Sequence, residues 1–353
     1  MKRILITSIL CFLMVTSVSA SQPRVITERL TVDQAVSSAI NASTDLRNLE
    51  YTVEDNNEAL DRLREQSRIE GDYARLLNLL VQIMQLETAN AQVNNNSAVA
   101  RDRLRISVMN LFAAIIQAEN GLVLTDESLA LEQRLLDIAR VRFQLGHISR
   151  LDFDTQVNNH NQRQATRELN RIAIDNAYIS LNQMMGRSLT LRYNLILDVT
   201  YQPLGDINLM GAINTAVAND PSVANQQGNI DVAEYRITRH ESEYSADTRE
   251  SLDRNLSQAE RAMYDTRRGI EQRMLTAYNS IRENEVLYNN AVLELEALRM
   301  QLPVQIRMHE LGRIRRIDLD QLRFRIAQQE ETVRSMGVSL AIDIIQFRNP
   351  ATL

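Results

Sequence analysis

Apolar residues recur along the chain in alternating steps of four and three, which is the spacing of a coiled-coil seam. One seam lies within residues 97–145 and a second within residues 274–306, where Glu285 and Arg299 interrupt it. The first comprises Leu104, Val108, Leu111, Ile115, Ala118, Leu122, Leu131, Leu135 and Ile138; the second comprises Met274, Tyr278, Ile281, Tyr288, Val292, Leu295, Leu302 and Ile306. A helix from about Ser97 to Leu145 would be on the order of 70 Å long. The pattern predicts long, uninterrupted helices.

Both seams lead into nearly the same short sequence. QLGHISRLDFD spans residues 144–154, and ELGRIRRIDLD spans residues 310–320. Aligned on Gly146 and Gly312, which are 166 residues apart, the two stretches share Leu, Gly, Ile, Arg and two Asp residues. We interpret the chain as an internal duplication, with one repeat over residues 21–186 and another over residues 187–353.

We predict that each repeated stretch turns one long helix back into another. The Gly ends the incoming helix in the left-handed conformation, the following Ile packs the turn, and the first Asp favours the returning helix through its dipole. The residues concerned are Gly146, Ile148 and Asp152 in the first turn and Gly312, Ile314 and Asp318 in the second. Two equivalent hairpin tips should therefore point the same way.

Shorter elements complete the pattern. Strict alternation from Leu189 to Tyr201 predicts one strand between the repeats, after a helix that ends at Gly186. A capping box of Thr31 with Gln34 begins a short amphipathic helix in the first repeat. Together these signals predict an all-α protein of antiparallel coiled-coil hairpins with one short strand segment between the repeats.

A second short helix follows Asn208. The helix that returns from the first tip is unusually polar between Asp154 and Asn170. A solvated outer face and a water-filled lumen both explain this stretch, and the sequence leaves the choice open.

The first twenty residues resemble a secretory signal peptide. Lys2 and Arg3 precede an apolar run, and small residues before Ser21 provide a cleavage site after Ala20. An uncleaved anchor is the less favoured interpretation, because the run is short for a membrane span. The only cysteine, Cys11, would be removed with the signal, so we expect an exported chain without disulfides.

Charge and motifs exclude several functions. Outside the signal, 37 Arg face 45 Asp and Glu, so nucleic acid is not an expected partner. The four histidines, His147, His160, His240 and His309, are isolated in the sequence. No phosphate-binding loop or nucleophilic serine motif occurs. We therefore expect neither an enzyme nor a bound cofactor or metal.

The order of these elements resembles the TolC-type outer-membrane efflux protein family. The stretches that carry the resemblance are LTVDQAVSSAINAS, QLGHISRLDFD, LNQMMG, AINTAVANDPSV and ELGRIRRIDLD. The resemblance covers nearly the whole chain after the signal. It implies a homotrimer whose long helices form an α-barrel tunnel across the cell envelope, as the exit duct of a tripartite efflux or type I secretion system.

The resemblance also implies roles for the two tips. They would dock a periplasmic adaptor protein, the partner of an inner-membrane transporter, and they would open and close the tunnel. The corresponding residues are Gly146, Arg150, Asp152, Asp154, Gly312, Arg313, Arg315, Arg316, Asp318 and Asp320. Asp318 matches an acidic position that can ring the entrance, whereas the second such position is Gln321 here.

One feature departs from the family. Between the long helices of each repeat the family inserts strands that form a barrel in the outer membrane. Here residues 67–91 and 240–257 lack the paired alternations and aromatic girdle of membrane strands, so we predict helical ends. Membrane attachment is therefore open, and a non-conducting coiled-coil spacer or scaffold is the alternative to a duct.

Overall fold

The computed structural model describes residues 24–240 and 248–353, and helices account for most of them. The first half contains strand β1, helices α1 to α4 and strand β2, with bounds Arg24–Thr31, Val32–Ala42, Thr44–Ile69, Tyr73–Gln144, Arg150–Met184 and Leu191–Ile196. The second half contains helices α5 to α8 and a short 3-10 helix, with bounds Leu209–Asn219, Pro221–Thr238, Arg249–Glu310, Arg316–Arg348 and Pro350–Thr352. The all-α prediction is confirmed.

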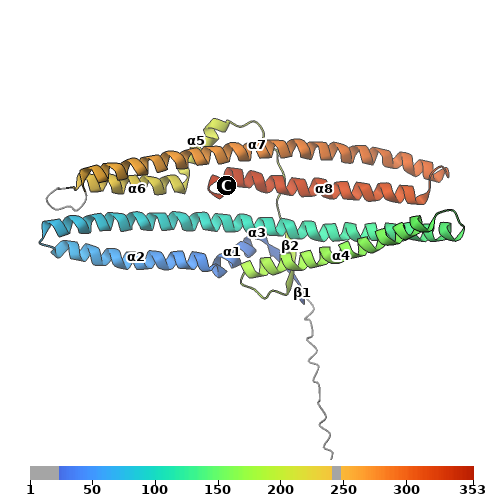
Figure 1. Cartoon of the computed structure of the whole chain (residues 1–353), viewed down its shortest axis with the longest axis horizontal. Coiled ribbons are helices and arrows are strands. Elements are labelled where there is room, and N and C mark those ends of the chain that lie inside the picture. Colours follow the sequence, from blue (N-terminus) through green and yellow to red (C-terminus); the bar gives the residue numbers. More distant parts are fainter. Residues whose placement is uncertain (1–23, 241–247) are drawn as a thin grey trace, which may run out of the picture.

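The helices lie side by side along one long axis (Figure 1). Helix α3 pairs with α2 over one half of its length and with α4 over the other, and α7 pairs likewise with α6 and α8. The two sets are joined because α3 also packs against α6 and α8. The turns from α3 to α4 and from α7 to α8 lie at the same end of the molecule (Figure 1).

Four apolar clusters hold this arrangement together. One joins β1, α1, α3, α4 and β2 around the fully buried Phe112 and Ile115. A second joins α5, α6, α7 and α8 around Ile270 and Met274. Smaller clusters lie between α3 and α8 and between α7 and α8. Most of the apolar packing is thus near the middle of the molecule and towards the tips.

Two strands form a small parallel sheet beside the helices. β1 pairs with β2, with Leu30 opposite Leu195 and a register irregularity between Val25 and Arg29. The predicted alternation from Leu189 to Tyr201 yields a shorter strand than expected, because β2 ends at Ile196 where its partner β1 runs into α1. β1 itself was not predicted.

Helix α3 differs from its predicted extent. It begins at Tyr73 rather than about Ser97, because the Asp72 side chain accepts the amide of Arg75, 3.1 Å away, and caps the helix there. The predicted seam also shifts towards the tip: Leu136 and Ala139 are buried, whereas Ile138 is exposed. Such drift is expected because the helical period is about 3.6 residues rather than 3.5.

The segments predicted to be helical in place of membrane strands are mostly helical where they are described. Residues 67–91 form the end of α2, a short turn and the start of α3, and residues 249–257 begin α7. Residues 241–247, within the second segment, and the predicted signal peptide lie outside the described residues. Among the described helices, α3 alone has a stretch apolar and long enough to cross a membrane, a property that core helices share.

Candidate functional site: the hairpin tips

The first tip is a helix ending closed by its own backbone. Gly146 has φ of 72°, and its amide donates to the carbonyl of Phe143 over 2.9 Å. The amide of His147 donates to the carbonyl of Arg142 over 2.8 Å, which completes the Schellman motif. A Cβ at Gly146 would meet no atom within 4 Å, so the glycine is needed for its left-handed backbone rather than for space.

The second tip repeats the same turn. Gly312 has φ of 71°, and its amide donates to His309 over 2.9 Å. The amide of Arg313 donates to the carbonyl of Met308, also over 2.9 Å. The duplicated sequence thus forms two turns with the same hydrogen bonds, as predicted.

The first Asp after each turn caps the returning helix. Asp152 Oδ2 accepts the amide of Ser149 over 3.2 Å, while Ser149 Oγ accepts the amide of Asp152 over 3.1 Å. In the second tip Asp318 Oδ2 accepts the amide of Arg315 over 3.0 Å. Asp152 thus completes a capping box with Ser149, whereas Asp318 supplies only half of one, because the Arg315 side chain has no acceptor for the Asp318 amide. Both roles are more specific than the predicted dipole interaction.

Asp318 also forms a bidentate ion pair. The guanidinium of Arg315 donates to its two oxygens over 3.1 and 2.7 Å. This hydrogen bonding lowers the pKa of Asp318 below its ordinary value of 3.8, and the same contact raises the pKa of Arg315. Because the folded-state pKa is depressed, the pair stabilises the turn above about pH 3.8 and is lost as the pH falls through the folded pKa.

The second Asp of each tip behaves differently in the two repeats. Among the described residues, Asp154 pairs with Arg150 alone, at 3.5 Å and on its own helix. Asp320 has a side chain that is 13% exposed and pairs with Arg134 of α3 at 2.6 Å, with Arg316 at 3.3 Å and with Arg323 at 3.8 Å. Asp320 therefore ties the second tip to the first hairpin.

Burial is also unequal between equivalent residues. Ile317 and Leu319 are buried, whereas Leu151, the counterpart of Ile317, is 76% exposed. The difference follows from position, since α8 lies between α7 and α3 while α4 packs on α3 and forms the edge of the chain. The predicted tip residues thus meet at one end of the molecule, but the first tip keeps an apolar side without a neighbour.

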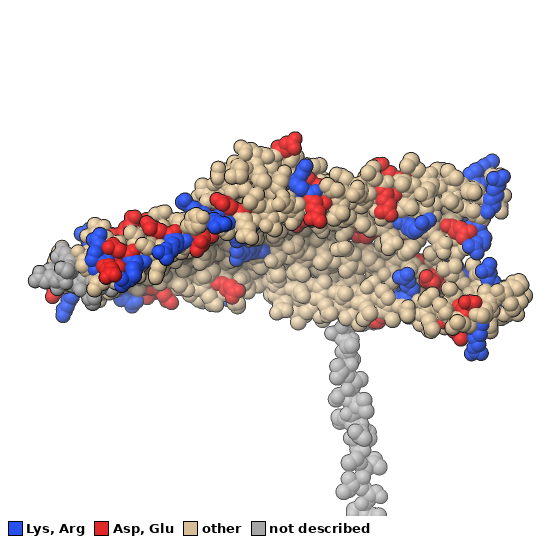
Figure 2. All heavy atoms as spheres, turned by 45° about the horizontal axis from the view of Figure 1, so that its top comes forward, with Lys and Arg blue, Asp and Glu red and all other residues tan. Residues whose placement is uncertain are grey.

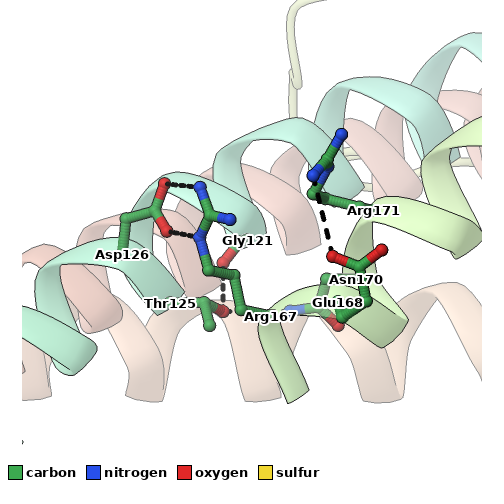
Figure 3. Close-up of polar contacts among 7 residues, drawn as sticks. All are labelled: Gly121, Thr125, Asp126, Arg167, Glu168, Asn170 and Arg171. Carbon is green, nitrogen blue, oxygen red and sulfur yellow. Dashed lines mark hydrogen bonds and ion pairs between the residues drawn. The ribbon is translucent and has the colours of Figure 1, made fainter. Parts of the chain in front are cut away.

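A polar cluster joins α3 and α4 away from the first tip (Figure 3). The guanidinium of Arg167 forms two contacts with the carboxylate of Asp126, which raise the pKa of the guanidinium. Beside it the Asn170 amide donates to Thr125 Oγ1 over 2.9 Å, and that hydroxyl donates to the Gly121 carbonyl over 2.8 Å.

Sequence reasoning did not identify this cluster or Arg134. Their partners lie 41 to 186 residues away in the chain, so no local motif reveals them. They fix the register of α3 against α4 and of α3 against α8. Among the described residues, no group of three or more His, Cys, Asp or Glu side chains is placed to hold a metal ion.

No protein-family model and no curated protein sequence matches the chain. Solved structures match it at low sequence identity, between 10 and 14%. A CusC structure, from work on folding and transmembrane channel formation, has a TM-score of 0.67 and 11% identity over 91% of both chains. The outer membrane protein VceC of Vibrio cholerae has a TM-score of 0.62 and 10% identity over 90% of this chain and 95% of its own.

The outer membrane channel CmeC of Campylobacter jejuni has a TM-score of 0.61 at 10% identity, over 91% of this chain and 86% of its own. Identities this low establish the fold alone. The chain has the fold of the TolC-type outer-membrane channels.

Proposed function

We propose that this protein is a cell-envelope exit duct, in which three copies close into a helical tunnel that takes up its cargo at the tip end. An adaptor protein of a tripartite efflux or type I secretion system would dock at the tips and connect the tunnel to an inner-membrane transporter. The fold shared with outer-membrane channels supports this function. The observation that carries it is that part of the apolar contact between the two repeats has exposed apolar counterparts on the outer helices, α4 and α7.

Within the chain, the two repeats meet where α8 packs on α3. Ile342 of α8 is buried against Ile106 and Met109 of α3, and Val338 and Ile345 pack beside it. This contact uses the face of α8 opposite Leu340 and Ile344, which pack in the cluster shared with α7. Helix α8 is thus covered on two sides, as a helix inside a continuous wall would be.

The 166-residue offset between the repeats gives the equivalent positions on the outer helices, α4 and α7. Val338 corresponds to Ile172, and Ile345 corresponds to Ile179, both exposed on α4. Met109 corresponds to Leu275, which is 42% exposed on α7. The other two buried residues of the contact, Ile106 and Ile342, have polar counterparts, Gln272 and Asn176. Leu275 begins a stripe of exposed apolar residues whose spacing keeps them on one face of α7; the others are Val286, Leu293, Met300, Val304 and Leu311.

We propose that these faces pack on each other in neighbouring copies. If α4 of one copy packs on α7 of the next as α8 packs on α3 within the chain, the same contact repeats around a ring and both edges are covered. A head-to-tail contact of this kind closes into a ring when the rotation from one copy to the next is a whole fraction of a full turn. A ring of three copies would place six hairpins around one opening.

The two tips would then form the opening that docks the adaptor and gates the tunnel. Asp152 and Asp318 test this role, because Asn in their place keeps an oxygen that can accept the capping amide but removes the charge. We expect the Asp152→Asn, Asp318→Asn double variant to keep its helicity and oligomeric state. Its conductance in planar bilayers should rise, because the Arg315 to Asp318 ion pair that stiffens the tip is lost.

The matched control is Asp253→Asn, which removes an exposed carboxylate paired with Arg249 at the opposite end of α7. It should leave the conductance unchanged. The double variant could instead lose its helicity or no longer form an oligomer, while its conductance never changes. That result would show that the two carboxylates serve only the fold.

A further inference from the structure

The tip end is basic in a chain that is acidic as a whole. The equivalent ranges 134–160 and 300–326 contain ten Arg and six Asp or Glu, whereas the whole chain has a formal net charge of −6. Each chain therefore carries four net positive charges within its two tips. Figure 2 shows the Arg side chains that project at this end, on the right of the view.

The carboxylates of the second tip are already bound by arginines. Asp318 is held by Arg315 through two contacts, and the side chain of Asp320 is mostly buried among Arg134, Arg316 and Arg323. Asp318 therefore does not provide the free acidic ring that the family resemblance suggests.

Several arginines at the tips have no such partner. Arg142, Arg313 and Arg325 are exposed, and no carboxylate of residues 24–240 or 248–353 lies within ion-pair distance of them. Arg313 directly follows the turn glycine, Gly312, so it stands at the apex of the second tip. The excess charge is thus carried by side chains that are free to act on solutes.

We infer that the tip opening selects anions, so that the cargo of the duct is anionic; this inference rests on the proposed function. Three copies would place twelve net positive charges around one opening. Fields from such a ring act over roughly 8 to 10 Å at physiological salt, which is enough to cover the mouth of a narrow channel. Rings of arginine favour anions and repel cations in this way.

Reversal potentials test the inference. The full-length mature protein is placed in planar bilayers under a KCl gradient, and the permeability ratio of Cl⁻ to K⁺ is measured. We expect a ratio above one for the unmodified protein and a fall by about a factor of two for Arg313→Gln, which removes one of the four net charges per chain. Arg313→Glu should lower the ratio further.

Arg267→Gln is the matched control. Arg267 is an exposed arginine of α7 with no carboxylate within ion-pair distance among the described residues, and about 65 Å of helix separate it from the tip. It should leave the ratio unchanged. K⁺ selectivity, or equal effects of Arg313→Gln and Arg267→Gln, would overturn the inference and leave the duct standing, whereas a solid or monomeric particle in electron microscopy would overturn the proposed function itself.

Discussion

The Ile172→Arg, Ile179→Arg double variant should be a monomer with unchanged helicity. Both side chains are exposed on α4 within a single chain, so arginine does not disturb the packing of the monomer. In the proposed ring they are buried against α7 of the next copy, where an unpaired charge costs several kcal/mol. Sedimentation velocity measures the change directly, because the trimer peak should be replaced by a monomer peak.

A control variant moves the same charges by one residue. Ala173 and Ser180 are exposed on α4 beside Ile172 and Ile179, but a step of one residue turns each side chain by about 100° around the helix. Ala173→Arg with Ser180→Arg should therefore keep the oligomer. If both double variants remain oligomeric, α4 does not form the contact between copies.

Glu285→Ala should cause a large loss of stability, about 3 kcal/mol. Its carboxylate is 6% exposed and binds the linker between the repeats, where it accepts the amide of Leu204 over 2.8 Å and the hydroxyl of Tyr201 over 3.3 Å. Arg282 donates to its second oxygen over 2.8 Å. Removal of the carboxylate leaves buried donors without an acceptor. The midpoint of guanidinium unfolding measures the resulting loss of stability.

Arg282→Ala is the comparison for this prediction. The Arg282 side chain is 47% exposed, so its removal leaves Glu285 with its other two donors and should cost about 1 kcal/mol. Equal effects of the two substitutions would show that the linker contacts of Glu285 contribute little. The same carboxylate raises the pKa of Tyr201, after the larger effect of desolvation, so that this hydroxyl keeps its proton as a donor.

The sequence predicted the features that depend on local pattern. The left-handed Gly146 and Gly312 and the capping box at Thr31 follow from short motifs, and the structure confirms each of them. The long helices follow from sparse Gly and Pro and from the apolar period. These signals involve residues that lie close together in the chain.

Features that join distant residues were beyond such reasoning. Glu285 looked like a break in the seam, and only the fold places it against the linker at Leu204. The pair of Arg134 with Asp320 spans 186 residues, and β1 becomes a strand because β2 lies beside it. Tertiary contacts determine these features. The role of the tips as a docking and gating end stays a prediction.

Electron microscopy of the purified mature protein distinguishes the duct from the alternative, a coiled-coil spacer, because the two have different shapes. We predict a hollow particle with threefold symmetry, in which α4 of each copy lies against α7 of the next and the six hairpin tips surround one opening. A solid rod or a single extended chain, with the apolar stripes of α4 and α7 facing solvent, would contradict this prediction.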